Sequence, residues 1–116
     1  MLFDENLYVY HEDPKSIEDV CRQKYRHGSG RIMIWKRIPS FEFLEERYFA
    51  KPLQGGLDKN YVLPTHCAFL LGYFQTLNDG DKYQEFMAFV EYVFKKHGKS
   101  LSDYEIIRDM IKEYER

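Results

Sequence analysis

The segment between Pro64 and Gly98 is dense in aromatic and aliphatic side chains. The whole chain has ten tyrosines, nine phenylalanines and one tryptophan among 116 residues. Each aromatic side chain can bury roughly 150–250 Å², so a helical module with this many rings can fill its core and keep some rings in reserve. We therefore expect a few rings to stay exposed after folding and to contact another macromolecule.

The composition is that of one folded domain. Of the 116 residues, 44% are hydrophobic and 31% are charged. A chain of this length can bury roughly two thirds of its unfolded surface, so it folds without disulfides or metals. We predict a single compact domain over residues 1–116. The net charge of −2 gives no overall attraction to nucleic acid or to an anionic membrane.

Little in the sequence points to chemistry. Cys21 and Cys67 are far apart and lie in apolar patterns, which favours buried thiols over a disulfide. The histidines, at positions 11, 27, 66 and 97, lack the spacing of a zinc site. We therefore predict no catalytic residue, no metal and no cofactor. An enzyme is the alternative reading if His11 or His27 meets a carboxylate or a cysteine in a polar pocket.

The start of the chain predicts a cytoplasmic location. Residues 1–6 turn acidic after Phe3 and contain neither a basic region nor a long apolar stretch, so we expect no signal peptide. The longest uninterrupted apolar run, Cys67 to Leu71, is far shorter than the ~20 residues that span a bilayer. These features predict a protein that does not associate with membranes.

Two short segments near the N-terminus have the composition of strands. Residues 7–10 and 31–38 are rich in β-branched and aromatic side chains. A helix between them is expected to begin at Asp13-Pro14 and to stop at Gly28, where glycine would form a left-handed cap. The two strands could pair either in parallel or antiparallel, and the sequence leaves both arrangements open.

The rest of the chain has helical periodicity. We expect a helix over residues 41–50, capped by Ser40 and ended by Pro52, and a long loop over residues 51–63. Three further helices are expected, at about residues 65–77, at 81–97 and after Ser102, and the first of these is apolar on nearly all sides, as in a central buried helix. The predicted fold is α+β and helix-dominated, with a small two-stranded N-terminal β element packed on four or five helices.

Basic side chains are concentrated in the middle of the chain. Residues 21–60 hold nine basic and four acidic side chains. Basic groups between aromatic ones suit single-stranded nucleic acid, an acidic protein, or simply a solvated helix face. Whether these groups meet on one surface distinguishes a binding site from a solvated helix face. The candidate contact residues from this region are Arg22, Arg26, Arg31, Trp35 and Arg37.

Three aromatic residues flank the glycine pair at positions 55 and 56. Tyr48, Phe49 and Tyr61 lie beside the expected loop, and we predict that they are exposed contact residues. The function predicted from all these features is a small protein-binding module, such as an inhibitor or an immunity-type protein that acts by occupying its partner. Nucleic-acid binding through residues 22–37 is the alternative, and a homodimer would also cover surplus rings.

Overall fold

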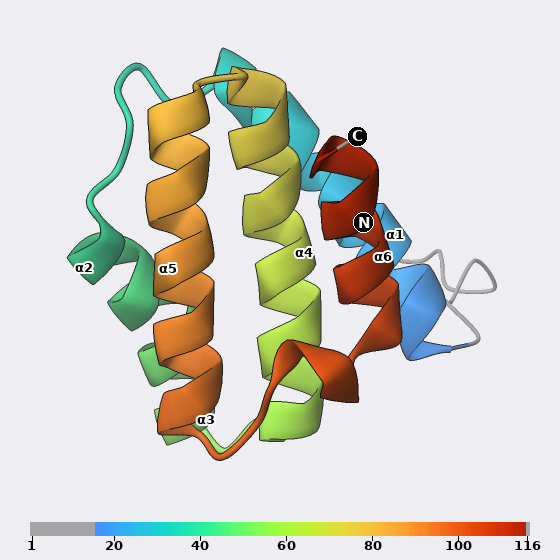
Figure 1. Ribbon diagram of the computed structural model, residues 1–116. Coiled ribbons are helices and arrows are strands. Elements are labelled where there is room, and N and C mark those ends of the chain that lie inside the picture. Colours follow the sequence, from blue (N-terminus) through green and yellow to red (C-terminus); the bar gives the residue numbers. More distant parts are fainter. Residues whose placement is uncertain (1–15, 116) are drawn as a thin grey trace, which may run out of the picture.

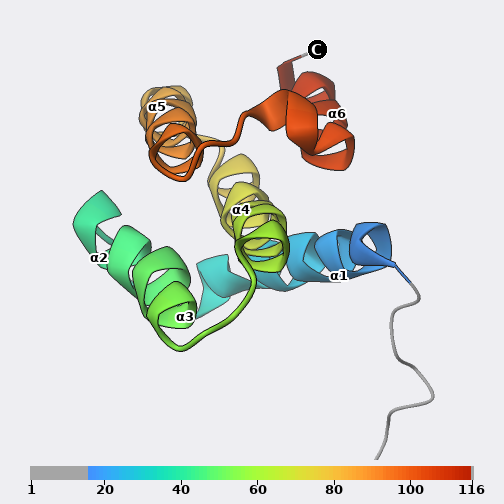
Figure 2. The same ribbon diagram turned by 90° about the horizontal axis from the view of Figure 1, so that it is seen from below.

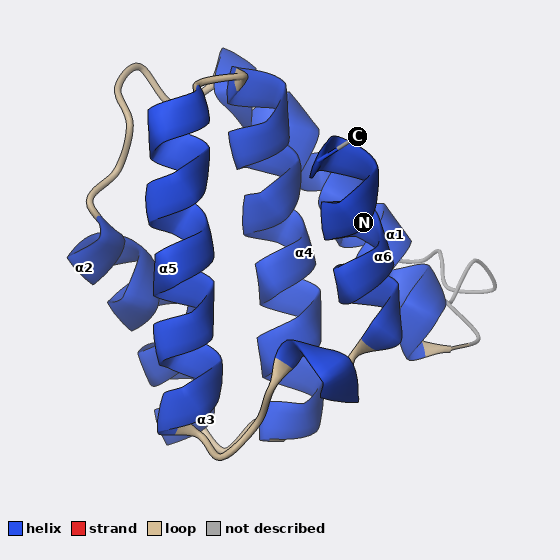
Figure 3. Ribbon diagram, viewed as in Figure 1, coloured by secondary structure: helices blue, strands red, loops and turns tan. Residues whose placement is uncertain are grey.

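The computed structural model describes residues 16–115, and every regular element in this range is a helix (Figures 1 and 3). Three short segments, η1, η2 and η3, are helices of other types. The segments η1 and η3 are 3₁₀-helices, and η2 is a π-helix. In chain order the elements are α1 (Ile17–Gly30), η1 (Arg31–Met33), α2 (Phe41–Glu45), η2 (Glu46–Ala50), α3 (Lys51–Gln54), α4 (Lys59–Leu77), α5 (Gly80–Lys96), η3 (Leu101–Asp103) and α6 (Glu105–Glu115).

The predicted α+β class is wrong. The expected strand at residues 31–38 is the turn η1 followed by irregular chain, and the expected strand at residues 7–10 lies outside the described residues. The amides of Ile34 and Trp35 both donate to the carbonyl of Arg31, so the backbone is satisfied locally. The Trp35 ring packs edge-on against Tyr73 of α4, with centroids 4.7 Å apart. Trp35 of this segment therefore packs against a helix, and its neighbours do not pair with a strand.

Helix α4 is the centre of the fold, as the sequence predicted. Seen from below, it lies between α5 and α6 on one side and α1, α2 and α3 on the other (Figure 2). Its residues from Val62 to Phe74 are buried, with the exception of the half-buried His66. Such a helix has no solvent face, because neighbouring helices cover it from all directions.

Helix α1 crosses α4 at a distance that only glycine permits. A Cβ atom built on Gly28 would lie 1.7 Å from the carbonyl oxygen of Phe69, and one built on Gly72 would lie 2.1 Å from that of Tyr25. The sequence-based expectation that Gly28 ends α1 is wrong, since the helix continues to Gly30. This glycine serves close packing between two helices.

Residues 41–54 form one continuous helical stretch through α2, η2 and α3. Ser40 caps it as predicted, and its hydroxyl accepts a hydrogen bond from the amide of Phe43 at 3.2 Å. Pro52 does not end the helix, and the expected loop over residues 51–63 shrinks to residues 55–58 between α3 and α4. Proline cannot donate to the carbonyl four residues earlier, here that of Tyr48, and its ring crowds that carbonyl in a regular helix. The π-helix η2 widens the backbone immediately before this proline.

His66 of α4 hydrogen-bonds the carbonyl that Pro52 cannot reach. Its Nδ1 atom donates to the carbonyl oxygen of Tyr48. The same ring lies edge-on to Tyr48 and Phe49, with centroids 6.0 Å and 6.4 Å away. A side chain that is distant in sequence thus stabilises the proline-containing helix.

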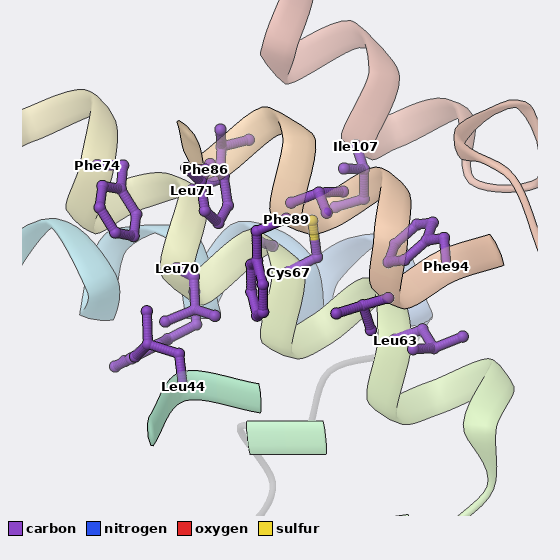
Figure 4. Packing of buried hydrophobic residues seen from close by; sticks show 14 of the residues in the cluster. Leu44, Leu63, Cys67, Leu70, Leu71, Phe74, Phe86, Phe89, Phe94 and Ile107 are labelled. Carbon is purple, nitrogen blue, oxygen red and sulfur yellow. The ribbon is translucent and has the colours of Figure 1, made fainter. Parts of the chain in front are cut away.

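Aromatic rings fill the space between α4, α5 and the 41–54 helical stretch (Figure 4). Phe74 of α4 stacks on Phe86 of α5 with ring centroids 4.7 Å apart, and Phe41 stacks on Phe74 at 5.8 Å. Phe49 meets Phe89 edge-on at 6.1 Å. Most of the aromatic surplus of the sequence is therefore used inside the fold.

Candidate functional site

The basic side chains of α1 do not all lie on one side of the helix. Arg22 and Arg26 lie one turn apart on the side of α1 that faces α6, and both are exposed. Lys24 is about half a helical turn away from Arg22 and Arg26. Its positive charge helps to lower the pKa of His66. Arg22 is also paired with Asp19 at 3.5 Å. The cations of α1 are thus divided between two sides of the helix.

Arg31 and Trp35 pack against the body of the protein. The Arg31 guanidinium lies 5.4 Å from the centroid of Phe69 and 5.7 Å from that of Trp35. Trp35 is half-buried against Tyr73 and Tyr48. Only Arg37, of the predicted residues in this segment, is freely exposed. The basic and aromatic side chains here partly stabilise one another.

The three predicted aromatic contact residues differ in exposure. Phe49 is 2% exposed and belongs to the core, so it cannot reach a partner in this conformation. Tyr48 is half-buried between Trp35 and Phe69. Tyr61 is 42% exposed, as expected. Phe41, Tyr48 and Phe49 recur at the seven- and eight-residue spacing of one helix face, and this pattern is the sequence signal for burial.

Among residues 16–115, the most exposed large hydrophobic side chains are Met33 and Ile34, which are not among the predicted contact residues. Met33 is 86% exposed and Ile34 is 61% exposed, and the charged side chains of Lys36 and Arg37 that follow them are exposed too. We call Met33 and Ile34 the apolar tip. Met33 is the last residue of η1, and Ile34 begins the chain between η1 and α2, which passes the upper end of the molecule in Figure 1. The expected strand over residues 31–38 gives no indication that these two side chains are exposed.

The other large exposed hydrophobic residues are scattered. They lie at the start of α1, in α2, between α3 and α4, at the start of α4 and in α5, and single exposed side chains of this kind are normal on a folded protein. They are Ile17, Phe43, Leu57, Tyr61 and Tyr92. The apolar tip differs because its two hydrophobic residues are consecutive and have cations beside them.

The two thiols are in environments that suppress reactivity. Burial raises the pKa of Cys21 to about 11, and burial also raises the pKa of Cys67. Both side chains are therefore protonated near neutral pH, whereas the thiolate is the reactive form. Among residues 16–115 no three histidine, cysteine or acidic side chains gather closely enough to hold a metal ion.

The buried imidazole of His66 predicts a pH-dependent stability. Burial lowers its pKa below the ordinary value of 6.5, the hydrogen bond to Tyr48 partly opposes this, and the charge of Lys24 adds to it. Because the unfolded chain binds the proton more readily, the free energy of unfolding is expected to fall as the pH drops through 6.5 towards the lower folded-state pKa. Urea denaturation at pH 7.5 and at pH 5.5 measures this loss.

The matched variant is His66→Asn. Asparagine keeps a neutral N–H donor near the position of Nδ1 but does not titrate in this range. In this variant, the difference between the free energies of unfolding at pH 7.5 and at pH 5.5 should be smaller than in the unmodified chain. If it retains the full difference, another group titrates and the assignment to His66 is wrong.

No helix among the described residues has both the length and the apolar character to cross a bilayer. The comparisons with known proteins add no relationship: no family model, no curated protein and no solved structure matches this chain.

Proposed function

We propose that the protein is a binding module that docks a partner protein through the apolar tip. The observation that carries this proposal is the exposure of Met33 and Ile34, at 86% and 61%, whereas most other large hydrophobic residues between positions 16 and 115 are buried or half-buried. Covering apolar surface gains roughly 25 cal/mol for each Å² removed from water. Met33 and Ile34 are therefore the side chains that gain most from a partner.

The charges beside the tip indicate the chemistry of that partner. Lys36 and Arg37 are exposed next to the two hydrophobic residues. Cations around an apolar centre increase the rate of encounter with an acidic surface and discriminate against basic ones. An acidic protein surface with an apolar pocket is the complement of this arrangement. Inhibition or toxin neutralisation would both follow from occupying such a surface.

The scaffold behind the tip is suited to this role. Trp35, next in sequence to Ile34, is fixed edge-on against Tyr73, and the Arg31 guanidinium lies over the Phe69 ring. These contacts hold both ends of the tip to α4, so little conformational entropy remains to be lost on binding. Nucleic-acid binding is less favoured, because the cations of α1 are divided between two sides of that helix.

Affinity capture with the tagged full chain tests the proposal. In an extract of cells that produce the protein, the unmodified chain should recover a stoichiometric partner. The variant with Met33→Asp and Ile34→Asp should recover it at least tenfold less well, because two charges replace the apolar contact and oppose an acidic surface. Both sites are exposed, so the thermal midpoint should change little.

Leu57→Asp is the matched control. Leu57 is 53% exposed and lies between α3 and α4, away from the tip, so this variant should bind the partner as the unmodified chain does. Recovery of no stoichiometric partner at any salt concentration would contradict the proposal. Equal recovery by the tip variant would contradict the assigned surface, and capture of nucleic acid in place of protein would favour the alternative function.

A further inference from the structure

A hollow lies at the start of α1, where this helix meets η3 and the first turn of α6. Its volume is about 390 Å³, which is comparable with the smaller pockets in which proteins bind ligands, of roughly 300 Å³ and more. Ile17 and Ile106 contribute apolar surface to its lining, and Ile17 is 41% exposed. We call this feature the acidic hollow, for the reason that follows.

Among the described residues that line this hollow, every charged side chain is acidic. They are Glu18, Asp103 and Glu105. Arg108 approaches Glu105 at 4.0 Å and partly offsets its charge. Glu18 and Asp103 form no ion pair with any other residue in the range 16–115, and Arg22, one turn beyond Glu18, is paired with Asp19. The hollow thus combines a negative charge with apolar contacts.

The apolar tip and the cations beside it have the complementary composition. Met33 and Ile34 are exposed, and so are Lys36 and Arg37. Neither of these two cations has an acidic partner within residues 16–115. An acidic surface with apolar contacts is the complement of this tip, and the acidic hollow of the same chain is such a surface.

The tip of one copy is too far from its own hollow to enter it. The hollow lies at the N-terminal end of α1, and the tip follows the C-terminal end of this helix. The 14 residues of α1 span about 21 Å. In Figure 1 the chain after η1 passes the upper end of the molecule, whereas α1 begins lower down on the right. The edge-on packing of Trp35 on Tyr73 fixes the chain beside the tip to α4. A contact between tip and hollow therefore requires two copies of the chain.

We propose that the apolar tip of one copy binds the acidic hollow of a second copy. Met33 and Ile34 would contact the apolar lining, and the two cations that follow them would meet Glu18 and Glu105. Each copy has one tip and one hollow, so the contact is head-to-tail and produces rings or open chains of copies. This inference rests on the function proposed above, because it names the partner of the same tip.

Sedimentation of the purified full chain at increasing concentration tests the proposal. The mean mass should rise above that of the monomer between micromolar and millimolar concentrations. The tip variant, Met33→Asp with Ile34→Asp, and the hollow variant, Glu18→Lys with Glu105→Lys, should each associate at least tenfold more weakly. A monomer at every concentration, or full association of either variant, would overturn the proposal.

A mixture of the two variants gives the sharper result. The tip variant keeps an intact hollow and the hollow variant keeps an intact tip, so the equimolar mixture should associate again although neither variant does so alone. A mixture that stays monomeric would overturn the proposal, because the two surfaces would then not bind each other.

The matched control is Glu85→Lys with Glu91→Lys on α5. It makes the same change in net charge as the hollow variant at two exposed positions outside the hollow, and it should associate as the unmodified chain does. Equal weakening by the control and the hollow variant would overturn the proposal. All exchanged positions are exposed, so the thermal midpoints should change little.

Other occupants of the hollow and of the tip give different results. Contacts between methyl groups of residues 1–15 and Ile106 in nuclear Overhauser spectra of the monomer would assign the hollow to the chain itself and overturn the proposal. A chain that stays monomeric but captures a different protein through its tip would overturn this inference and support the proposed function. Absence of any partner in both experiments would contradict both.

Discussion

Replacing Gly28 by alanine is expected to lower the free energy of unfolding by about 3 kcal/mol or more. The new methyl group would lie 1.7 Å from the carbonyl oxygen of Phe69 and 2.7 Å from its carbon. Both are backbone atoms of a buried helix, so no side chain can move aside to make room. The helices α1 and α4 must separate, and the contacts along their whole crossing are weakened. Urea denaturation with a fixed slope measures the change.

Gly30→Ala is the matched control on the same helix. A Cβ atom at Gly30 meets no atom within 4 Å, and its backbone is right-handed helical with φ −72°. Alanine is favoured over glycine in helices, so this variant should be stabilised by up to about 1 kcal/mol. The changes in unfolding free energy at Gly28 and Gly30 should have opposite signs, which separates the effect of helix–helix contact from that of helix propensity.

Gly72 is the reciprocal position on α4. Alanine there would lie 2.1 Å from the carbonyl oxygen of Tyr25, and a comparable loss is expected. The double variant Gly28→Ala with Gly72→Ala should lose less unfolding free energy than the sum of the two single losses, because one separation of the helices makes room for both methyl groups. If Gly28→Ala and Gly72→Ala each change stability by less than about 0.5 kcal/mol, the close crossing of α1 and α4 is wrong.

Phe74→Ala is expected to cost about 3–5 kcal/mol. Phe74 is fully buried, and its ring contacts Phe86 at 4.7 Å, Tyr73 at 5.1 Å and Phe41 at 5.8 Å between centroids. Truncation removes these contacts and leaves a cavity between rigid helices that cannot close completely. Chemical denaturation monitored by far-ultraviolet circular dichroism measures the loss.

Tyr92→Ala serves as the control for the loss of a ring. Tyr92 is 53% exposed on α5, and Lys96 lies 5.6 Å from its centroid. Its removal should lower the free energy of unfolding by less than about 1 kcal/mol.

A double-mutant cycle that combines Phe74→Ala with Phe86→Ala should reveal a coupling energy of about 0.5–1.5 kcal/mol between the two rings. Additive losses for Phe74 and Phe86 would contradict the stacked geometry.

Local features of the sequence predicted the helices well. Ser40 caps the stretch that begins at Phe41, and Gly98 ends α5 with a positive φ of 73°. The apolar character of residues 65–77 on all sides predicted the central position of α4, which is confirmed. Caps and periodicity depend on residues a few positions apart, so the sequence carries them directly.

The candidate surface was predictable only in part. The sequence leaves open whether its basic and aromatic residues meet on one contact surface. In the structure Phe49 is buried, and Arg31 lies over the rings of Phe69 and Trp35. Met33 and Ile34 lie in an expected strand, yet they are the most exposed large hydrophobic residues of the part of the chain that the structure describes. Exposure depends on which helix covers which side chain, and periodicity within one segment does not specify that.

By itself the sequence determined where most of the helices lie, the caps at Ser40 and Gly98 and the identity of the central helix, because these follow from interactions within one or two turns. Tertiary structure decided three features that the sequence pattern misassigned. Gly28 lies within a helix that passes against the Phe69 carbonyl. Pro52 is tolerated where η2 widens the helix and His66 bonds the Tyr48 carbonyl. Residues 31–38 form no strand, and Trp35 packs half-buried against Tyr73 of α4. In each case the deciding group comes from a distant part of the chain, and only folding brings it into contact.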